Sequence, residues 1–262
     1  KQSNYMSMVG GDGACMGCGE KTTVHLLLST VNAFMGPRIE EHVKHLDSLI
    51  ADLDDKAHRM LIEATDLDEV PTDTDDLSIH LEGEKKERVL LIRKTIEQLK
   101  DLKWRYEEGP SGRGRAKRGF TNATGCTSVW GSSYPYNPYP FPWVNHLFQD
   151  APSVAVGIFE GHMAKMAEGF KAVRMAELEL NGGYNETEHG EFLRYFDWTR
   201  FSDEEWLLCP PVVAIGGDGA MFDIGFQNLS RVLMTDMPIK VMVLDTQVYS
   251  NTGGQACTSG FT

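Results

Sequence analysis

The stretch from Val212 to Gln255 constrains the fold of this chain more than any other part. It contains an apolar run, a glycine-rich turn around Asp218, an amphipathic segment, a second apolar run ending at Leu244, and a polar loop. Because glycines form such a tight turn at the lowest cost, this order indicates strand, turn, helix, strand and loop. That is one βαβ unit of a parallel sheet, and it predicts an α/β fold.

Polar residues follow both predicted strands at their carboxyl ends, where parallel sheets bind their ligands. Asp218 follows the first strand, and Thr246 and Asn251 follow the second. Mg²⁺ prefers a carboxylate together with phosphate oxygens, and glycines let the backbone approach a phosphate. We therefore expect a magnesium–diphosphate site with Asp218 and the Thr246 hydroxyl on the metal, although an Asp after a strand can also cap a helix. The backbone expected along the diphosphate belongs to Gly217, Gly219 and Ala220.

This stretch resembles a known motif. The spacing from Gly217-Asp218-Gly219 to Asn251 is similar to that of the thiamine diphosphate motif, and the tail Asp245–Gln255 resembles that of the pyruvate:ferredoxin (flavodoxin) oxidoreductases. The resemblance implies a thiamine diphosphate-binding fold with a mostly parallel sheet flanked by helices. It also implies that the Val248 carbonyl completes the magnesium ligands. Asn251 would face the cofactor near its thiazole, as the candidate catalytic residue.

The five cysteines are an odd number in a domain of this size, which favours a reducing, cytoplasmic location over a disulfide framework. Cys15 and Cys18 form a C-x-x-C pair before a helix predicted to start near Glu20. Such a pair fits a zinc knuckle, a thioredoxin-type redox pair or an iron–sulfur cluster. Cys126 taken alone is more typical of a buried apolar thiol.

The segments Cys15–Glu20 and Thr121–Gly131 resemble the same oxidoreductase family. The resemblance implies a [4Fe–4S] cluster on Cys15, Cys18 and Cys126, with its fourth ligand outside this chain. It also implies that Glu20 and Cys126 contact thiamine diphosphate, whereas the alternative role for Glu20 is a carboxylate favoured by the helix dipole. A second Gly-Asp-Gly, at 11–13, follows no apolar run, and we do not expect it to contact the cofactor.

Residues 36–119 do not resemble the shorter members of that family and are interpreted as an insertion. The first heptad seam consists of Ile39, Val43, Leu46, Ile50, Leu53, Ala57, Met60 and Ala64. The second consists of Val89, Ile92, Ile96 and Leu99, with Tyr106 further along, and an acidic link at 66–76 separates them. The pattern predicts an antiparallel helical hairpin, either as a docking element or as a self-contained decoration. Three histidines on it, His42, His45 and His58, are expected in solvent.

Three further segments carry expectations of their own. Residues 108–119 have the composition of a flexible linker, and their basic residues are expected in solvent or against an acidic partner such as ferredoxin. These basic residues are Arg113, Arg115, Lys117 and Arg118. The aromatic, proline-rich segment Ser133–Trp143 is expected to cover the cofactor pocket, or else to be a polyproline ligand. Val154–Phe159 is interpreted as a strand and Gly161–Leu180 as a helix.

Two regions follow from these patterns: 1–35 with 120–262 as a thiamine diphosphate- and Mg²⁺-binding α/β domain, and 36–119 as the hairpin and linker. The resemblance implies oxidative decarboxylation of a 2-oxo acid, most of all pyruvate, to acyl-CoA and CO₂. Electrons would pass to [4Fe–4S] clusters and then to ferredoxin or flavodoxin. The alternatives are a non-oxidative thiamine diphosphate-dependent decarboxylase or synthase, and a non-catalytic electron-transfer or assembly module.

The chain is expected to be a fragment that is inactive alone, because in the family the aminopyrimidine glutamate and the substrate-binding residues belong to other domains. The intact enzyme is expected to be a homodimer. The net charge of −13 argues against a general nucleic-acid binder. No apolar run approaches the roughly 20 residues that cross a bilayer, so we expect no membrane partner.

Overall fold

The computed structural model describes residues 14–15, 17–63, 83–131, 143–146 and 150–260. The chain divides into two compact units, each assembled from separate stretches. Unit 1 consists of 1–38, 116–163 and 207–262, and unit 2 of 39–115 and 164–206. Among the described helices, none combines the length and the apolar character that spanning a bilayer requires.

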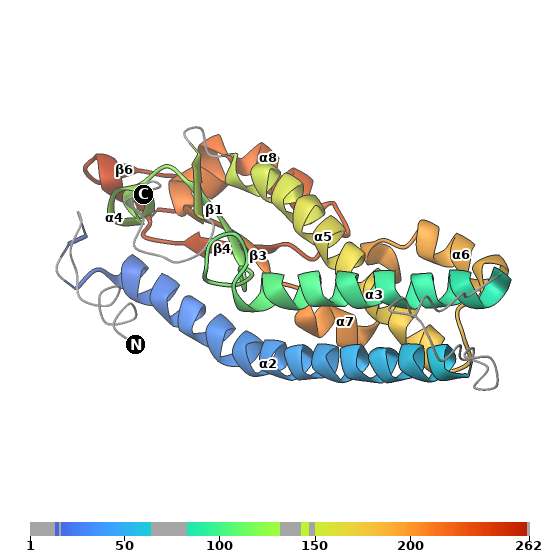
Figure 1. The fold of residues 1–262 in the computed structure, drawn as a ribbon. Coiled ribbons are helices and arrows are strands. Elements are labelled where there is room, and N and C mark those ends of the chain that lie inside the picture. Colours follow the sequence, from blue (N-terminus) through green and yellow to red (C-terminus); the bar gives the residue numbers. More distant parts are fainter. Residues whose placement is uncertain (1–13, 16, 64–82, 132–142, 147–149, 261–262) are drawn as a thin grey trace. The chain divides into compact units, whose positions relative to one another are not determined.

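Unit 1 is built on a parallel four-stranded sheet in the order β2-β1-β3-β4. Figure 1 labels β1, β3 and β4 of this sheet. The strands are β1 Gly119–Ala123, β2 Trp143–His146, β3 Val212–Gly217 and β4 Lys240–Leu244. The two central strands, β1 and β3, are almost wholly buried, as is usual for a parallel sheet covered on both faces. The predicted α/β fold is confirmed. β1 escaped prediction because its sequence, GFTNA, interrupts its apolar residues with Thr and Asn and offers no apolar run.

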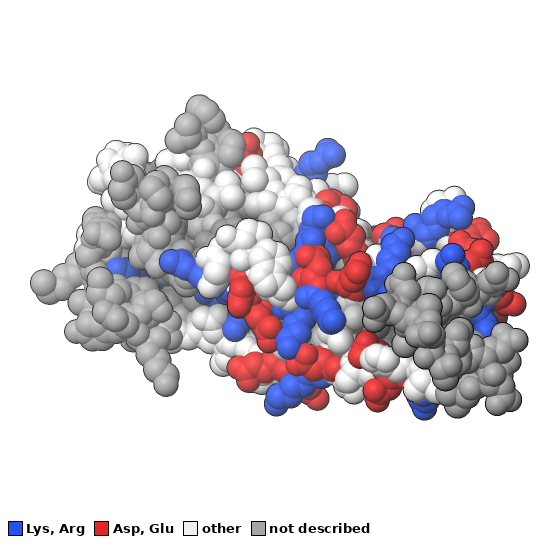
Figure 2. All heavy atoms as spheres, in the orientation of Figure 1, with Lys and Arg blue, Asp and Glu red and all other residues white. Residues whose placement is uncertain are grey.

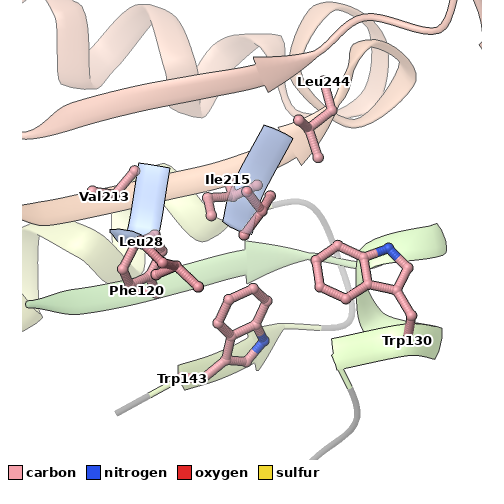
Figure 3. Close-up of a cluster of buried hydrophobic side chains, with 8 residues drawn as sticks. Leu28, Phe120, Trp130, Trp143, Val213, Ile215 and Leu244 are labelled. Atoms are coloured by element: carbon pink, nitrogen blue, oxygen red, sulfur yellow. The ribbon is translucent and has the colours of Figure 1, made fainter. Parts of the chain in front are cut away.

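Helices cover both faces of this sheet. On one face, the start of α2 (Gly19–Ile62) packs Leu28 into the apolar cluster drawn in Figure 3. That cluster contains Val24, Leu28, Phe120, Trp130, Trp143, Val213, Ile215 and Leu244. Thr121 points to the opposite face, because side chains alternate along a strand, and its hydroxyl donates to the Ala151 carbonyl at 2.8 Å. Ala151 begins α5 (Ala151–Leu180).

The predicted strand at Val154–Phe159 is wrong, because these residues lie within the 30-residue helix α5. The buried positions Ala151, Ala155, Phe159 and Met163 recur every four residues, which is helical spacing. Over a short window, an apolar run does not distinguish a buried strand from a buried helix. The remainder of α5 agrees with the predicted helix.

Unit 2 contains the predicted antiparallel helical hairpin. Its arms are the part of α2 after Arg38 and helix α3 (Gly83–Glu107). Lys103 Nζ lies 2.6 Å from Asp47 Oδ1, and the Tyr106 ring meets the His42 ring edge-on at 5.2 Å. Contacts therefore run from later residues of α3 to earlier residues of α2, which shows that the two arms are antiparallel. The predicted first helix and the first arm form a single 44-residue helix that continues through Pro37.

The seam of the first arm differs from the predicted heptad. Ile39, Leu46, Leu53 and Ala57 are buried as predicted, but His42 and Leu49 are buried in place of Val43 and Ile50. The expectation that His42 lies in solvent is therefore wrong, whereas His45 and His58 are exposed. Burial lowers the pKa of His42 to about 4, and the charges of His45 and Arg115 act in the same direction. The second seam is buried as predicted and also includes Thr95 and Leu102.

A buried carboxylate joins three segments of unit 2. Glu179 is 2 % exposed, and its Oε1 lies 2.7 Å from Lys56 Nζ and 2.9 Å from Arg88 Nε. Its Oε2 accepts the Tyr184 amide at 3.0 Å. The unit is completed by α6 Glu186–Arg194, η2 Trp198–Arg200 and most of α7 Asp203–Leu208. On the face shown in Figure 2, acidic and basic side chains are intermixed over the helices of this unit.

The segment after α3 forms successive turns. Gly114 has φ +72°, and a Cβ there would lie 2.2 Å from the Tyr106 carbonyl oxygen, so this turn requires glycine. Arg118 is buried and donates to Asn32 Oδ1, which contradicts its expected place among solvent-facing basic residues. The expectations for the acidic link at 66–76, for Ala64, for Gly11-Asp12-Gly13 and for 133–142 fall outside the described residues.

Candidate functional site

A pocket of about 210 Å³ in unit 1 lies where β1, β3 and β4 end. Three loops line it, one after each of these strands. The loops after β3 and β4 were expected from the strand-end rule, whereas the loop after β1 was not, because β1 itself was not predicted. Of the residues selected from the sequence, its walls include Glu20, Cys126, Gly217, Asp218, Gly219, Ala220, Val248 and Asn251. Residues that the sequence analysis did not select are Thr124, Gly125, Thr127, Ile224, Tyr249, Ser250 and Thr252.

Asp218 stands between β3 and a short π-helix, η3 (Gly219–Ile224), and is only 1 % exposed. The Thr246 hydroxyl lies 3.3 Å from its Oδ1. Its Oδ2 accepts from Ser259 Oγ at 2.8 Å and from Cys257 Sγ at 3.1 Å. Burial acts to raise the pKa of Asp218, but the hydrogen bonds outweigh it, so the pKa is lower than usual and the carboxylate is ionised at neutral pH.

The loop after β4 brings two more oxygens to the same place. Thr246 Oγ1 lies 3.1 Å from the Val248 carbonyl oxygen as well as 3.3 Å from Asp218 Oδ1. Between them, Gln247 has φ 60°, a left-handed conformation that is uncommon for a residue other than glycine. A carboxylate, a hydroxyl and a carbonyl are the hard oxygen ligands that Mg²⁺ accepts beside phosphate. The donor set therefore fits the metal that was predicted from the sequence.

Tyr249 packs over the glycine turn. A Cβ on Gly219 would lie 2.5 Å from the Tyr249 ring, so only glycine allows this approach. The Tyr249 hydroxyl donates to Asp223 Oδ2 at 2.7 Å, and this bond raises the pKa of Tyr249 to about 12. Asp223 also accepts the Thr258 amide at 3.2 Å. These contacts join the loop after β4 to the π-helix that follows Asp218.

At the other side of the pocket, Glu20 lies in the first turn of α2. Its Oε2 is buried and has no hydrogen-bond partner among the described residues. Burial raises the pKa of Glu20, and the charge of Asp218 raises it further, while contacts with Trp130 and Ser250 partly offset both. A buried carboxyl oxygen without a partner suits a ligand that carries a donor, such as a nitrogen heterocycle.

The three predicted cluster ligands are placed differently. Cys126 begins α4 (Cys126–Gly131), and its Sγ lies 3.5 Å from Ser250 Oγ. Burial raises the pKa of Cys126, and the charges of Glu20, Cys18 and Cys15 add to this effect. Cys15 is exposed and Cys18 is half-buried, just before α2. Within the part of the chain that the structure describes, no three His, Cys, Asp or Glu side chains form a group able to hold a metal.

Cys257 and Ser259 are site residues that sequence reasoning missed. They reach Asp218 because β5 (Val248–Tyr249) and β6 (Gln255–Ala256) pair antiparallel and turn the chain back. Two glycines with positive φ, at 253 and 254, make this turn. The Gly-Gly pair was a signal for a hairpin, but nothing in the sequence indicated which atom the returning segment would meet.

Comparisons with known proteins identify relatives of this sequence. Residues 207–262 match the family "Thiamine pyrophosphate enzyme, C-terminal TPP binding domain". The chain is 33% identical to a pyruvate-flavodoxin oxidoreductase of Enterobacter agglomerans over 179 residues, covering 53% of this chain and 15% of the relative. It is 30% identical to a pyruvate:ferredoxin oxidoreductase of Moorella thermoacetica over 175 residues, covering 52% and 15%.

A third relative is the pyruvate synthase subunit PorB of Methanocaldococcus jannaschii, 31% identical over 140 residues, which are 53% of this chain and 36% of that subunit. The chain thus spans a minor part of the length of these curated relatives. The comparisons confirm the resemblance to pyruvate:ferredoxin and pyruvate-flavodoxin oxidoreductases. The matched segment, 207–262, contains the Asp218 turn and the loop after β4.

Proposed function

We propose that this chain, which carries a thiamine pyrophosphate-binding domain at 207–262, is the cofactor-binding part of a 2-oxo acid:ferredoxin or flavodoxin oxidoreductase acting on pyruvate. One observation carries the proposal. Asp218 Oδ1, Thr246 Oγ1 and the Val248 carbonyl oxygen lie 3.1–3.3 Å from one to the next, beside a pocket walled by backbone glycines. This arrangement supplies a hard-cation site next to room for a diphosphate.

The residues have separate roles in the proposal. Asp218, Thr246 and the Val248 carbonyl hold Mg²⁺. The backbone of Gly217, Gly219 and Ala220 contacts the diphosphate. At the far side, Glu20, Cys126 and Asn251 contact the organic part of the cofactor, with Asn251 acting near the reacting centre. When bound, thiamine diphosphate supplies a nucleophilic carbon for the 2-oxo acid carbonyl and accepts the electron pair that CO₂ leaves behind.

The proposal includes a [4Fe–4S] cluster on Cys15, Cys18 and Cys126, with a fourth ligand from elsewhere in the enzyme. Cys126 lines the pocket, and Cys15 and Cys18 lie just before α2 in the same unit. The raised pKa of Cys126 means that this residue is a neutral thiol until a metal displaces its proton. Iron content and absorbance near 400 nm of the intact enzyme, against a Cys126→Ser variant, test this part; absence of iron would favour a non-oxidative thiamine enzyme.

The enzyme needs partners beyond this chain. Coenzyme A accepts the acyl group, ferredoxin or flavodoxin accepts electrons, and other domains of the same homodimeric enzyme provide the rest of the active site. The names of the relatives support both electron acceptors. All five cysteines are free, which supports a cytoplasmic location.

The decisive test replaces Asp218 by Ala in the intact enzyme and measures thiamine diphosphate binding by calorimetry with and without Mg²⁺. We expect metal-dependent affinity to fall by more than about 100-fold, because even residues that only support metal ligands cost about 10–100-fold when removed. Asp236→Ala, at an exposed position of the same unit, is the matched control. Undiminished binding by Asp218→Ala would refute the assignment, and a wild-type enzyme that binds no thiamine diphosphate would favour a non-catalytic module.

A further inference from the structure

The two oxygens of the Asp218 carboxylate have different surroundings. Oδ2 accepts two hydrogen bonds, from Ser259 Oγ at 2.8 Å and from Cys257 Sγ at 3.1 Å. Oδ1 faces the Thr246 hydroxyl at 3.3 Å, beside the Val248 carbonyl. Oδ2 therefore carries two protein donors, whereas Oδ1 carries only the longer contact with the Thr246 hydroxyl, which is itself one of the proposed metal ligands.

The segment that occupies Oδ2 is held firmly against the metal loop. After the β5–β6 hairpin, Gly260 approaches so closely that a Cβ there would lie 2.5 Å from the Gln247 carbonyl oxygen. The Thr258 amide, between the two donors, is bonded to Asp223 at 3.2 Å. Cys257 Sγ and Ser259 Oγ are themselves 3.2 Å apart, so both converge on the same oxygen.

We infer that Ser259 and Cys257 are positioning residues that limit Asp218 to one metal-facing oxygen and so make the site select Mg²⁺ over Ca²⁺; this inference rests on the proposed function. Mg²⁺ requires a compact octahedron with ligands at about 2.0–2.1 Å, which suits a carboxylate that offers one oxygen. Ca²⁺ takes 6–8 oxygens at about 2.3–2.6 Å and often binds both oxygens of a carboxylate. With Oδ2 occupied by two donors, Ca²⁺ loses that second oxygen.

The two donors contribute unequally. The Ser259 hydroxyl is a stronger donor than the Cys257 thiol, because S–H is a weak donor. Removing Ser259 Oγ frees Oδ2 to rotate toward the metal, whereas replacing Cys257 by Ser keeps a donor. The Ser259→Ala change should therefore alter metal preference more than Cys257→Ala, and Cys257→Ser should alter it least.

The experiment measures thiamine diphosphate binding to the intact enzyme by calorimetry while free Mg²⁺ or free Ca²⁺ is varied. For Ser259→Ala we expect the half-saturating Mg²⁺ concentration to rise about tenfold, as is usual when a residue supporting a metal ligand is lost. The half-saturating Ca²⁺ concentration should stay constant or fall, so the preference for Mg²⁺ decreases by about tenfold or more. The double variant Ser259→Ala with Cys257→Ala should lose more of the preference for Mg²⁺ than either single variant.

Ser29→Ala, at an exposed position of α2, is the matched control, and the melting temperature of each variant shows that it is folded. If Ser259→Ala weakens the binding of Mg²⁺ and of Ca²⁺ equally, or changes the binding of neither ion, the inference is wrong. A purely structural role of Ser259 predicts no change in the preference for Mg²⁺ over Ca²⁺. The Cys257→Ser variant tests the inference independently if Ser259→Ala does not fold, because a lost preference with the donor retained would contradict the mechanism. A wild-type enzyme without metal-dependent binding would overturn the proposed function instead.

Discussion

Two buried carboxylates, one in each unit, have opposite kinds of partners. Glu179 in unit 2 is 2 % exposed and meets two cations, Lys56 at 2.7 Å and Arg88 at 2.9 Å. Asp218 in unit 1 is 1 % exposed, and among the described residues its side chain is hydrogen-bonded by neutral groups of Thr246, Cys257 and Ser259. Both are buried charges, but only Glu179 meets its countercharge within the part of the chain that the structure describes.

The difference separates a structural ion pair from a cation site. Burying a charge costs several kcal/mol unless an opposite charge compensates it. At Glu179, burial acts to raise the pKa, but Lys56, the Tyr184 amide and Arg88 lower it. At Asp218, neutral donors also keep the carboxylate ionised against burial, yet they leave its charge uncompensated. The missing positive charge is what a bound metal would provide.

The largest expected effect is the loss of Glu179. In Glu179→Ala, Lys56 and Arg88, whose side chains are 23 % and 38 % exposed, lose their anion. Each lost hydrogen bond to a charged group costs about 1.5–3 kcal/mol. Hydrogen exchange of the α2 and α3 amides in the intact protein should show that the free energy of local opening falls by that amount. Glu168→Ala, whose pair with Lys165 is exposed, should change opening by less than about 1 kcal/mol. Equal effects would remove the contrast between the two kinds of pair.

Acid should destabilise unit 2 through His42, a buried group whose charged form is disfavoured by its surroundings. Its pKa is about 4 when folded and about 6.5 when unfolded, so the unfolded state binds more protons between these values. The contribution of neutral His42 to the free energy of unfolding is fully present above about pH 6.5. It falls by about 3 kcal/mol as the pH drops to about 4. Hydrogen exchange at several pH values, corrected for intrinsic rates, measures this loss.

His42→Phe keeps an aromatic ring against Tyr106 and removes the titrating group, so that part of the acid dependence should disappear. His58→Phe, on an exposed side chain of the same helix, is the control and should retain it. Acid dependence that survives in His42→Phe would assign it to other groups.

The smallest expected change in stability tests Asp218 itself. Asp218→Asn removes the charge of the side chain but keeps its shape. In EDTA, which removes metal, we therefore expect the free energy of unfolding to change by no more than about 1 kcal/mol. The stabilisation that Mg²⁺ and thiamine diphosphate give to the wild type should be lost in the variant. Melting curves with EDTA and with both ligands measure the two effects. A loss of about 3 kcal/mol in EDTA would mean that Asp218, like Glu179, is structural.

Contiguous patterns made much of this structure predictable. β3, β4, the helical hairpin and the Asp218 turn each have a local signal, either an apolar run, a heptad or a glycine turn. β1 lacked one, because its burial comes from its central place in the sheet rather than from apolar residues. His42 is buried because its ring packs edge-on against Tyr106 of the other arm. Helical periodicity within one arm does not predict a contact with a residue of the other arm.

Within the site, the residues nearest to the strand ends were predictable and the returning segment was not. Asp218 directly follows β3 and Thr246 lies two residues after β4, so topology places them together. Cys257 and Ser259 arrive by way of a hairpin, and their distance from Asp218 depends on the register of β5 and β6. The contact of Glu20 with the cofactor was expected from the family resemblance alone, since spacing does not relate the first turn of α2 to β3.

The left-handed backbone at Gln247 has a consequence for how this site can change over evolution. A side chain at that φ costs about 1 kcal/mol or more, so neighbouring structure must maintain it, and Gly260 packs against its carbonyl. A substitution at 260 alone would displace the Gln247 carbonyl. It would thereby also move the Thr246 hydroxyl and the Val248 carbonyl oxygen, the two proposed metal ligands on either side. Position 260 is therefore expected to remain glycine among homologous sequences whichever residue occupies 247, because the carbonyl that it meets belongs to the backbone.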